Sequence, residues 1–123
     1  MKLSLEVWEN QNGTVVYCRG RIVYREEATA LSRKVSALLP RSRGLVLDLG
    51  GVEMIDSTGL GELVLLHMRA QAAGCEVKLA GAREHIRQLL ELTNLASVFE
   101  IYPSAEQALE SFRERVAQRG ACA

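Results

Sequence analysis

The segment from Gly51 to Glu62 reads GVEMIDSTGLGE, and it joins an apolar, strand-like run to a long apolar, helix-like run. This pattern predicts a strand, a tight turn and the start of a helix. Asp56 or Ser57 can cap that helix, because either side chain can accept a hydrogen bond from an amide of the first turn. Gly59 and Gly61 remove side chains from the turn, which leaves its backbone amides approachable.

Strand patterns and helix patterns alternate on both sides of this junction. The expected strands cover 3–7, 14–18, 44–50, 76–80 and 97–102, and the expected helices cover 26–39, 58–73, 83–92 and 104 to about 118. Such alternation predicts parallel strands joined by crossover helices. Turn residues 10–13 add an antiparallel hairpin at the N-terminus.

These elements predict one α/β domain over residues 1–123, with a mixed β-sheet flanked by helices. We expect about four to five strands, including the N-terminal hairpin, and about four helices. Residues 119–123 are expected to form a frayed tail.

Composition argues against several classes of protein. The 123 residues include 15 basic and 15 acidic side chains, and the formal net charge is zero. Nucleic-acid-binding and polybasic membrane-surface proteins normally carry a basic excess, so we expect neither direct nucleic-acid binding nor membrane insertion. The N-terminus lacks the apolar segment of a signal peptide. Cys18, Cys75 and Cys122 form no metal-binding pattern, and we expect free thiols in a reducing cytoplasm.

The junction suits a regulatory switch better than it suits catalysis. A helix N-terminus favours negative charge by about 0.3–1 kcal/mol, and a phosphate on Ser57 would place such a charge there. Spacing alone favours a simpler explanation, since helix capping accounts for most such clusters of residues. No Lys follows the glycines as in a phosphate-binding P-loop, and Ile55 occupies the position where a nucleophile elbow needs Gly. We therefore predict no catalytic residue, no metal and no cofactor, and we interpret His67 and His85 as ordinary surface or boundary residues.

A longer stretch that includes the junction resembles the STAS domain, a family named for sulfate transporters and anti-sigma factor antagonists. The stretch reads GLVLDLGGVEMIDSTGLGELVLLHMRAQAAGCEVKLAG, and the similarity extends from TVVYCRGRI to LLELTNLASVFEIYPSAEQAL. The resemblance implies a mixed sheet flanked by helices. It also implies that Ser57 is the phosphorylation site of an anti-sigma factor antagonist.

The partners that the resemblance implies are an anti-sigma factor that is itself a serine kinase and a serine/threonine phosphatase that resets the cycle. Unphosphorylated antagonist would bind the kinase and free a sigma factor. One position departs from the family pattern, since Val23 stands where antagonists usually have Asp. Two alternatives therefore stay open. One is an unphosphorylated scaffold subunit of a transport, lipid-trafficking or stress-signalling complex. The other is a small nucleotide-binding enzyme that uses Gly59 and Gly61 as a phosphate cradle.

The helix after the junction carries two apolar stripes. Leu60, Val64, Met68 and Ala72 form one with Gly61, and Leu63, Leu66 and Ala70 form the other. We expect a partner to cover the turn together with the second stripe. The predicted partner-binding residues are Asp56, Ser57, Thr58, Gly59, Leu60, Gly61, Leu63 and Leu66.

Overall fold

A computed structural model describes the backbone of residues 3–122 and the side chains of residues 3–113. Within these residues the chain forms five strands and four helices, which alternate after the β1–β2 hairpin, and two short 3₁₀ turns. Their bounds are β1 Ser4–Asn10, β2 Gly13–Ile22, α1 Tyr24–Leu38, η1 Leu39–Arg41, β3 Gly44–Ile55, α2 Ser57–Ala72, β4 Glu76–Ala80, α3 Glu84–Leu92, η2 Leu95–Ser97, β5 Ile101–Tyr102 and α4 Ala105–Cys122.

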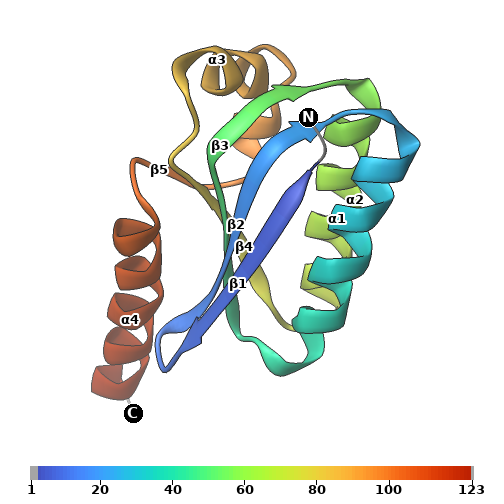
Figure 1. Ribbon diagram of the computed structural model, residues 1–123. Helices are drawn as coiled ribbons and strands as arrows, with labels where there is room; N and C mark the ends of the chain where they lie inside the picture. The colour runs from blue at the N-terminus through green and yellow to red at the C-terminus, as the bar shows by residue number, and fades with distance from the viewer. Residues whose placement is uncertain (1–2, 123) are drawn as a thin grey trace.

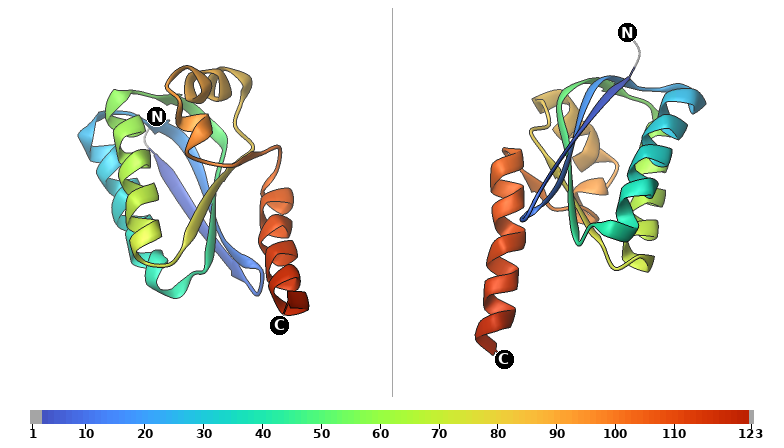
Figure 2. Two further views of the ribbon diagram at one scale, coloured as in Figure 1. Left: turned by 180° about the vertical axis from the view of Figure 1, so that it is seen from behind. Right: turned by 60° about the horizontal axis from the view of Figure 1, so that its bottom comes forward.

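The strands form one mixed sheet in the order β1-β2-β3-β4-β5. β1 runs antiparallel to β2, and the other neighbours are parallel. Helices α1 and α2 lie side by side on one face of the sheet, α4 lies on the opposite face, and α3 lies near the end of the sheet where the chain leaves β3 (Figure 1, Figure 2). The predicted fold class is confirmed, including the N-terminal hairpin.

The main core lies between the sheet and the layer of α1 and α2. The helical spacing of apolar residues in α1 produces this contact, because its inward positions Ala28, Leu31, Val35 and Leu38 are all buried. Strand β3 is central and mostly buried, which suits its nearly continuous apolar run. None of the helices in the described part of the chain is long and apolar enough to span a membrane.

The second face of the sheet has a smaller core under α4, and a buried lysine lies within it. Lys78 of β4 is 1% exposed. Its ammonium lies 3.0 Å from a carboxylate oxygen of Glu100 and donates a 2.6 Å hydrogen bond to Ser111 Oγ on α4. It also lies 4.4 Å from the ring centroid of Phe112. These contacts compensate the buried charge and attach α4 to the sheet.

Several expected boundaries were wrong, since β1, β2 and β3 run to Asn10, Ile22 and Ile55, past their expected ends at 7, 18 and 50. The strand expected at 97–102 is only Ile101–Tyr102, because Asn94 adopts a left-handed conformation with φ 63° and the chain turns through η2. That turn buries both Leu95 and Phe99 in the main core. Helix α4 continues to Cys122, past the end expected at about residue 118, and Gly120 alone does not stop the helix. Ala123 lies outside the described residues.

Candidate functional site

The turn between β3 and α2 is organised by the side chain of Asp56. This residue is the N-cap of α2, and its Oδ1 accepts a 2.9 Å hydrogen bond from the Gly59 amide. Of the two capping candidates in the sequence, the structure therefore selects Asp56. Ser57 is the first residue of the helix proper.

Asp56 also holds the neighbouring junction, between β2 and α1. Its Oδ2 accepts a 2.9 Å hydrogen bond from the Tyr24 amide, and its own amide donates to the Ile22 carbonyl at 3.3 Å. We call these two bonds, together with the cap to Gly59, the Asp56 clamp. The clamp joins the starts of α1 and α2, so the two helices share one anchor at this end of the sheet.

The clamp explains an unusual backbone conformation at Tyr24. Its φ of 61° lies in the left-handed region, which costs a residue with a bulky side chain of the order of 1 kcal/mol or more. The bond from the Tyr24 amide to Asp56 helps to hold this conformation. Nothing in the local sequence indicates it, because the partner residue lies 32 positions further along the chain.

The clamp also keeps Asp56 ionised. The amides of Tyr24 and Gly59 donate to its carboxylate, and their effect outweighs that of burial, so the pKa of Asp56 lies below its ordinary value of 3.8. The turn therefore carries a fixed negative charge at neutral pH, directly before Ser57.

Ser57 and Thr58 are both exposed at the start of α2. Among the described residues, none forms a hydrogen bond with the Ser57 hydroxyl, so this group is accessible and unengaged. The first-turn amides nearby favour an added negative charge, while the Asp56 carboxylate opposes it. A modified Ser57 would therefore change the charge of this turn without disturbing any bond that the side chain makes.

The two glycines of the turn differ in their surroundings. A Cβ on Gly59 would collide with the Ile22 carbonyl oxygen and would lie 2.8 Å from Ile55 Cγ2, whereas a Cβ on Gly61 would meet nothing within 4 Å. Gly59 is buried, and its amide is already bonded to Asp56. The prediction that Gly59 contacts a partner was therefore wrong, and its amide is not offered to a phosphate as the cradle hypothesis requires.

The two stripes of α2 have opposite environments. The inner stripe, Leu63, Leu66 and Ala70, is buried against the sheet and α1, with Leu63 and Leu66 at 0% exposure. The prediction that Leu63 and Leu66 bind a partner was therefore wrong. Sequence periodicity identified two apolar faces on this helix, but it could not tell which of them faces the sheet.

The outer stripe consists of Leu60, Val64, Leu65 and Met68. Leu60 is half-buried, and Met68 is the most exposed of the four at 58%. This stripe begins within the first turn of the helix, next to Ser57, so the accessible hydroxyl and the exposed apolar surface form one continuous area. Such a surface is typical of protein–protein contacts.

Val23 lies beside the clamp, at the position where the resemblance led us to expect an acid. Its side chain is 5% exposed. Val23 is the N-cap of α1, directly before Tyr24, and it makes no side-chain capping bond. An acid here would add a second negative charge near Ser57. In this chain Asp56 supplies the carboxylate at the turn.

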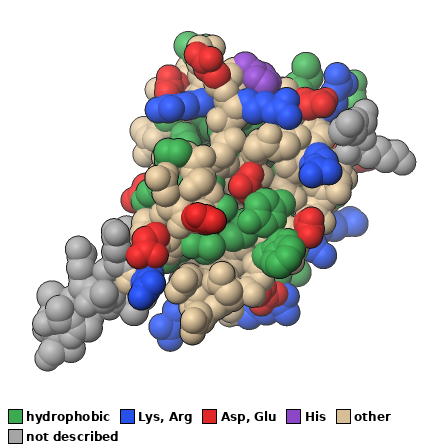
Figure 3. All heavy atoms as spheres, turned by 60° about the vertical axis from the view of Figure 1, so that its left-hand side comes forward, with side chains coloured by type: hydrophobic (Ala, Val, Ile, Leu, Met, Phe, Trp, Pro, Cys, Tyr) green, Lys and Arg blue, Asp and Glu red, His purple; other side chains and the backbone are tan. Residues whose placement is uncertain are grey.

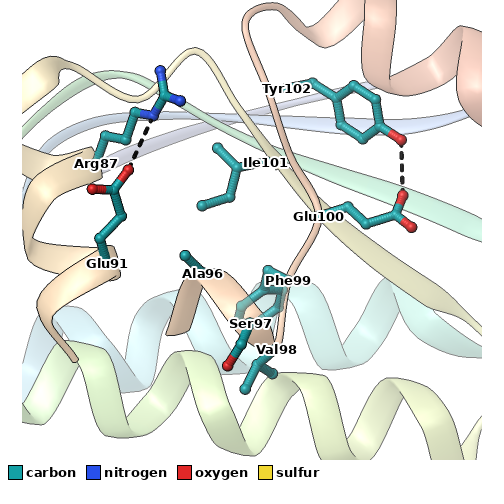
Figure 4. Close-up of a pocket in the computed structure, with 9 residues that line it drawn as sticks. All are labelled: Arg87, Glu91, Ala96, Ser97, Val98, Phe99, Glu100, Ile101 and Tyr102. Atoms are coloured by element: carbon teal, nitrogen blue, oxygen red, sulfur yellow. Dashed lines mark hydrogen bonds and ion pairs between the residues drawn. The ribbon is translucent and has the colours of Figure 1, made fainter. Parts of the chain in front are cut away.

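A separate hollow lies between α3, η2 and β5 (Figure 4). Its lining residues fall between Arg87 and Tyr102, so none of them belongs to the Asp56 clamp. Its volume is about 670 Å³, and Ile101 and Phe99 contribute apolar side chains to it. Its charged residues are engaged, since Arg87 pairs with Glu91 at 3.5 Å and Tyr102 donates to Glu100 at 2.8 Å. No nucleophile with a neighbouring base lines this hollow.

The other reactive side chains of the described region have structural surroundings. His85 Nε2 lies 2.7 Å from the Glu53 carbonyl, and the His67 ring packs edge-on against Phe99. Cys18 and Cys75 are free and buried, and burial raises their thiol pKa values to about 12 and about 11. In the part of the chain that is described, no group of three potential ligands could hold a metal ion.

Comparison with known proteins gives a consistent result. The model of the STAS domain family matches residues 4–108. The anti-sigma-B factor antagonist of Bacillus subtilis is 29% identical over 111 residues, which cover 89% of this chain and 100% of the relative. BtrV of Bordetella bronchiseptica, described as a candidate anti-sigma factor antagonist, is 27% identical over 114 residues, covering 92% of this chain and 96% of that protein.

Solved structures agree with these sequence relatives. The crystal structure of an anti-sigma factor antagonist from Mycobacterium paratuberculosis matches with a TM-score of 0.81 and 26% identity, covering 91% of this chain and 95% of that one.

Proposed function

The chain belongs to the STAS domain family, and on that premise we propose that it is an anti-sigma factor antagonist switched by phosphorylation of Ser57. In its unphosphorylated state it binds an anti-sigma factor that is also a serine kinase, and the sigma factor is released. A serine/threonine phosphatase restores the binding state. The cycle operates in the cytoplasm through protein contacts alone, and the chain itself catalyses no reaction.

The observation that carries this proposal is the position of Ser57. Its hydroxyl is exposed, has no hydrogen bond within the described part of the chain, and lies between the fixed charge of Asp56 and the outer stripe. A phosphate adds about 1.5 to 2 negative charges. The fold tolerates this charge, because the amides at the helix start favour it. A partner that covers the same surface does not, because excluded water strengthens like-charge repulsion.

The corrected partner-binding surface contains the outer stripe of α2 in place of the inner stripe. The partner covers Asp56, Ser57, Thr58 and Gly61 of the turn and continues along Leu60, Val64, Leu65 and Met68. Apolar contact along α2 supplies affinity, and the turn supplies the switch.

The direct test measures binding of Ser57 variants to the anti-sigma factor by calorimetry. We expect Ser57→Ala to bind like the unmodified protein, and Ser57→Asp to bind at least about tenfold more weakly, because it places a charge in the interface. Leu92→Glu is the matched surface control, since Leu92 is an 83% exposed apolar residue on α3. Equal affinities of Ser57→Asp and the unmodified protein would contradict the switch.

Phosphorylation itself is tested by intact mass and phosphopeptide mapping after incubation with the kinase and ATP. We expect one phosphate, on Ser57. A phosphate on Thr58 instead would move the switch by one residue and contradict the assignment.

The unphosphorylated scaffold remains the second candidate, and Val23 is the observation that favours it. This buried apolar residue removes the acid that antagonists usually carry beside the site. Binding by α2 without any gain of mass in the kinase assay would support the scaffold over the switch.

A further inference from the structure

Strand β1 forms a free edge of the sheet. It has seven residues, and among the described residues it pairs only with β2. The opposite edge, β5, has two residues and lies beside the hollow of Figure 4. An edge strand of seven residues presents a row of unpaired backbone groups, which is a template for another strand.

The turn of the hairpin fixes which backbone groups point outward. Asn10 and Gly13 flank a two-residue turn and pair across it, so they exchange backbone hydrogen bonds. Alternation along the strand then points the amides and carbonyls of Leu5, Val7 and Glu9 away from β2. These three residues form the outward set of β1.

The edge lacks several of the features that usually prevent strand addition, although it carries two acids, Glu6 and Glu9. β1 contains no Pro and no Lys, and its register with β2 runs without a bulge from Ser4 to Asn10. Natural sheets normally protect a long edge with one of these devices. Glu6 and Glu9 are both engaged within the chain, by Trp8 and Arg41, so the edge stays competent to pair.

An exposed aromatic surface adjoins the edge, on the face of the sheet that also carries α4. Trp8 is 60% exposed, Tyr17 is 40% exposed, and the two residues are diagonal neighbours across the β1–β2 pair. Figure 3 shows hydrophobic side chains gathered in the middle of this side of the molecule, with acidic side chains around them. The packing of α4 leaves this part of the face open.

We propose that β1 pairs antiparallel with β1 of a second copy of this chain, about a two-fold axis through Val7. In this register residue 7 faces residue 7, and the outward set of one copy pairs with the outward set of the other. The two five-stranded sheets join into one continuous sheet. The interface is isologous and closed, so it yields a dimer and not a fibre.

The side chains are self-complementary in the same register. Trp8 faces Glu6 of the other copy, which repeats a contact already made within the chain, where the Trp8 indole donates to Glu6 at 3.0 Å. Glu9 faces Leu5, and it already pairs with Arg41 at 2.8 Å. No acid stands directly opposite another acid, a pairing that would be destabilising. The two indoles lie diagonally across the axis, where each covers apolar surface of the other.

The test uses the purified chain alone and needs no anti-sigma factor, so its outcome is independent of the proposed function. Analytical ultracentrifugation should give a dimer whose population rises with protein concentration. Trp8 is the only tryptophan, so its fluorescence reports on this interface directly. Its emission should shift to shorter wavelength as the dimer forms. A monomer at every concentration, with constant emission, would overturn the proposal.

Substitutions test the register. Trp8→Glu places two new acids beside the axis and opposite Glu6, so dimerisation should weaken by about tenfold or more. Circular dichroism should show an intact fold, because Trp8 is mostly exposed. Adding Glu6→Lys to Trp8→Glu places opposite charges face to face and should restore the dimer. The matched control Leu92→Glu should dimerise normally.

Val7→Pro provides an independent check on the backbone. Proline removes an amide that points to the free edge, so the β1–β2 pairing loses no bond while the dimer loses two symmetry-related ones. We expect a folded monomer. A dimer that persists in both Val7→Pro and Trp8→Glu would place the interface elsewhere and refute the β1 pairing.

Discussion

The inner and outer stripes of α2 differ in what surrounds them and hardly in composition. Leu63 and Leu66 on the inner stripe have no solvent exposure, while Val64 and Met68 on the outer stripe are 37% and 58% exposed. The inner stripe therefore stabilises the fold, and the outer stripe is accessible to a protein partner. The same residue types can serve these separate tasks because the sheet and α1 cover only one side of the helix.

The largest expected effect is the contrast between Leu66→Glu and Met68→Glu. Leu66→Glu forfeits roughly the 2–5 kcal/mol lost when a buried leucine is truncated, and it adds an unpaired charge to the core. We expect this variant to be largely unfolded by circular dichroism at room temperature. Met68→Glu should change the free energy of unfolding by about 0.5 kcal/mol or less while weakening binding of the anti-sigma factor. Similar melting temperatures for the two variants would remove the distinction between the stripes.

Asp56→Ala should have the next largest effect, because the clamp fixes how α2 presents its inner stripe to the sheet. The substitution removes the N-cap and the bond to Tyr24, and we expect a loss of about 2 kcal/mol in the free energy of unfolding. Urea denaturation measures this loss. Asp56→Asn is the control, since it retains a capping oxygen and should be less damaging. Equal stability of Asp56→Ala and the unmodified protein would show that the clamp is not needed.

The charge of the clamp predicts a pH dependence. The folded-state pKa of Asp56 is lowered, so its contribution to stability is fully present above the unfolded-state value near 3.8 and is lost as the pH falls through the folded-state value. The melting temperature of Asp56→Asn should therefore lie below that of the unmodified protein at neutral pH. The gap should narrow as the pH falls below about 4. A gap that widens in acid would contradict the lowered pKa.

Ser57→Ala should have the smallest effect on stability. Asp56 provides the cap and the described residues make no bond to the Ser57 hydroxyl, so the free energy of unfolding should change by about 0.5 kcal/mol or less. Urea denaturation of Ser57→Ala and Asp56→Ala under the same conditions checks that Asp56→Ala loses more free energy of unfolding. A loss of more than about 1 kcal/mol would indicate that Ser57 shares the capping role.

Local patterns in the sequence determined most of the elements and part of the candidate site. Period-two and helical spacing predicted the hairpin, α1, β4 and the ends of α2. Gly74 adopts a left-handed φ of 73° just past α2, and Ser104 Oγ accepts from the Gln107 amide at the start of α4. These features depend on interactions between residues a few positions apart, so a short segment carries the information that specifies them.

Contacts between distant residues decided the rest. The bond between Tyr24 and Asp56, the burial of Lys78 under α4 and the choice of which α2 stripe faces the sheet all join segments far apart in the chain. Periodicity shows that a helix has apolar faces, but only the packing of the sheet and α1 determines which face loses its contact with water. The sequence alone therefore determined that Ser57 lies at the junction between a strand and a helix. The tertiary structure decided which apolar surface stays exposed beside it, because burial is a property of the assembled layers.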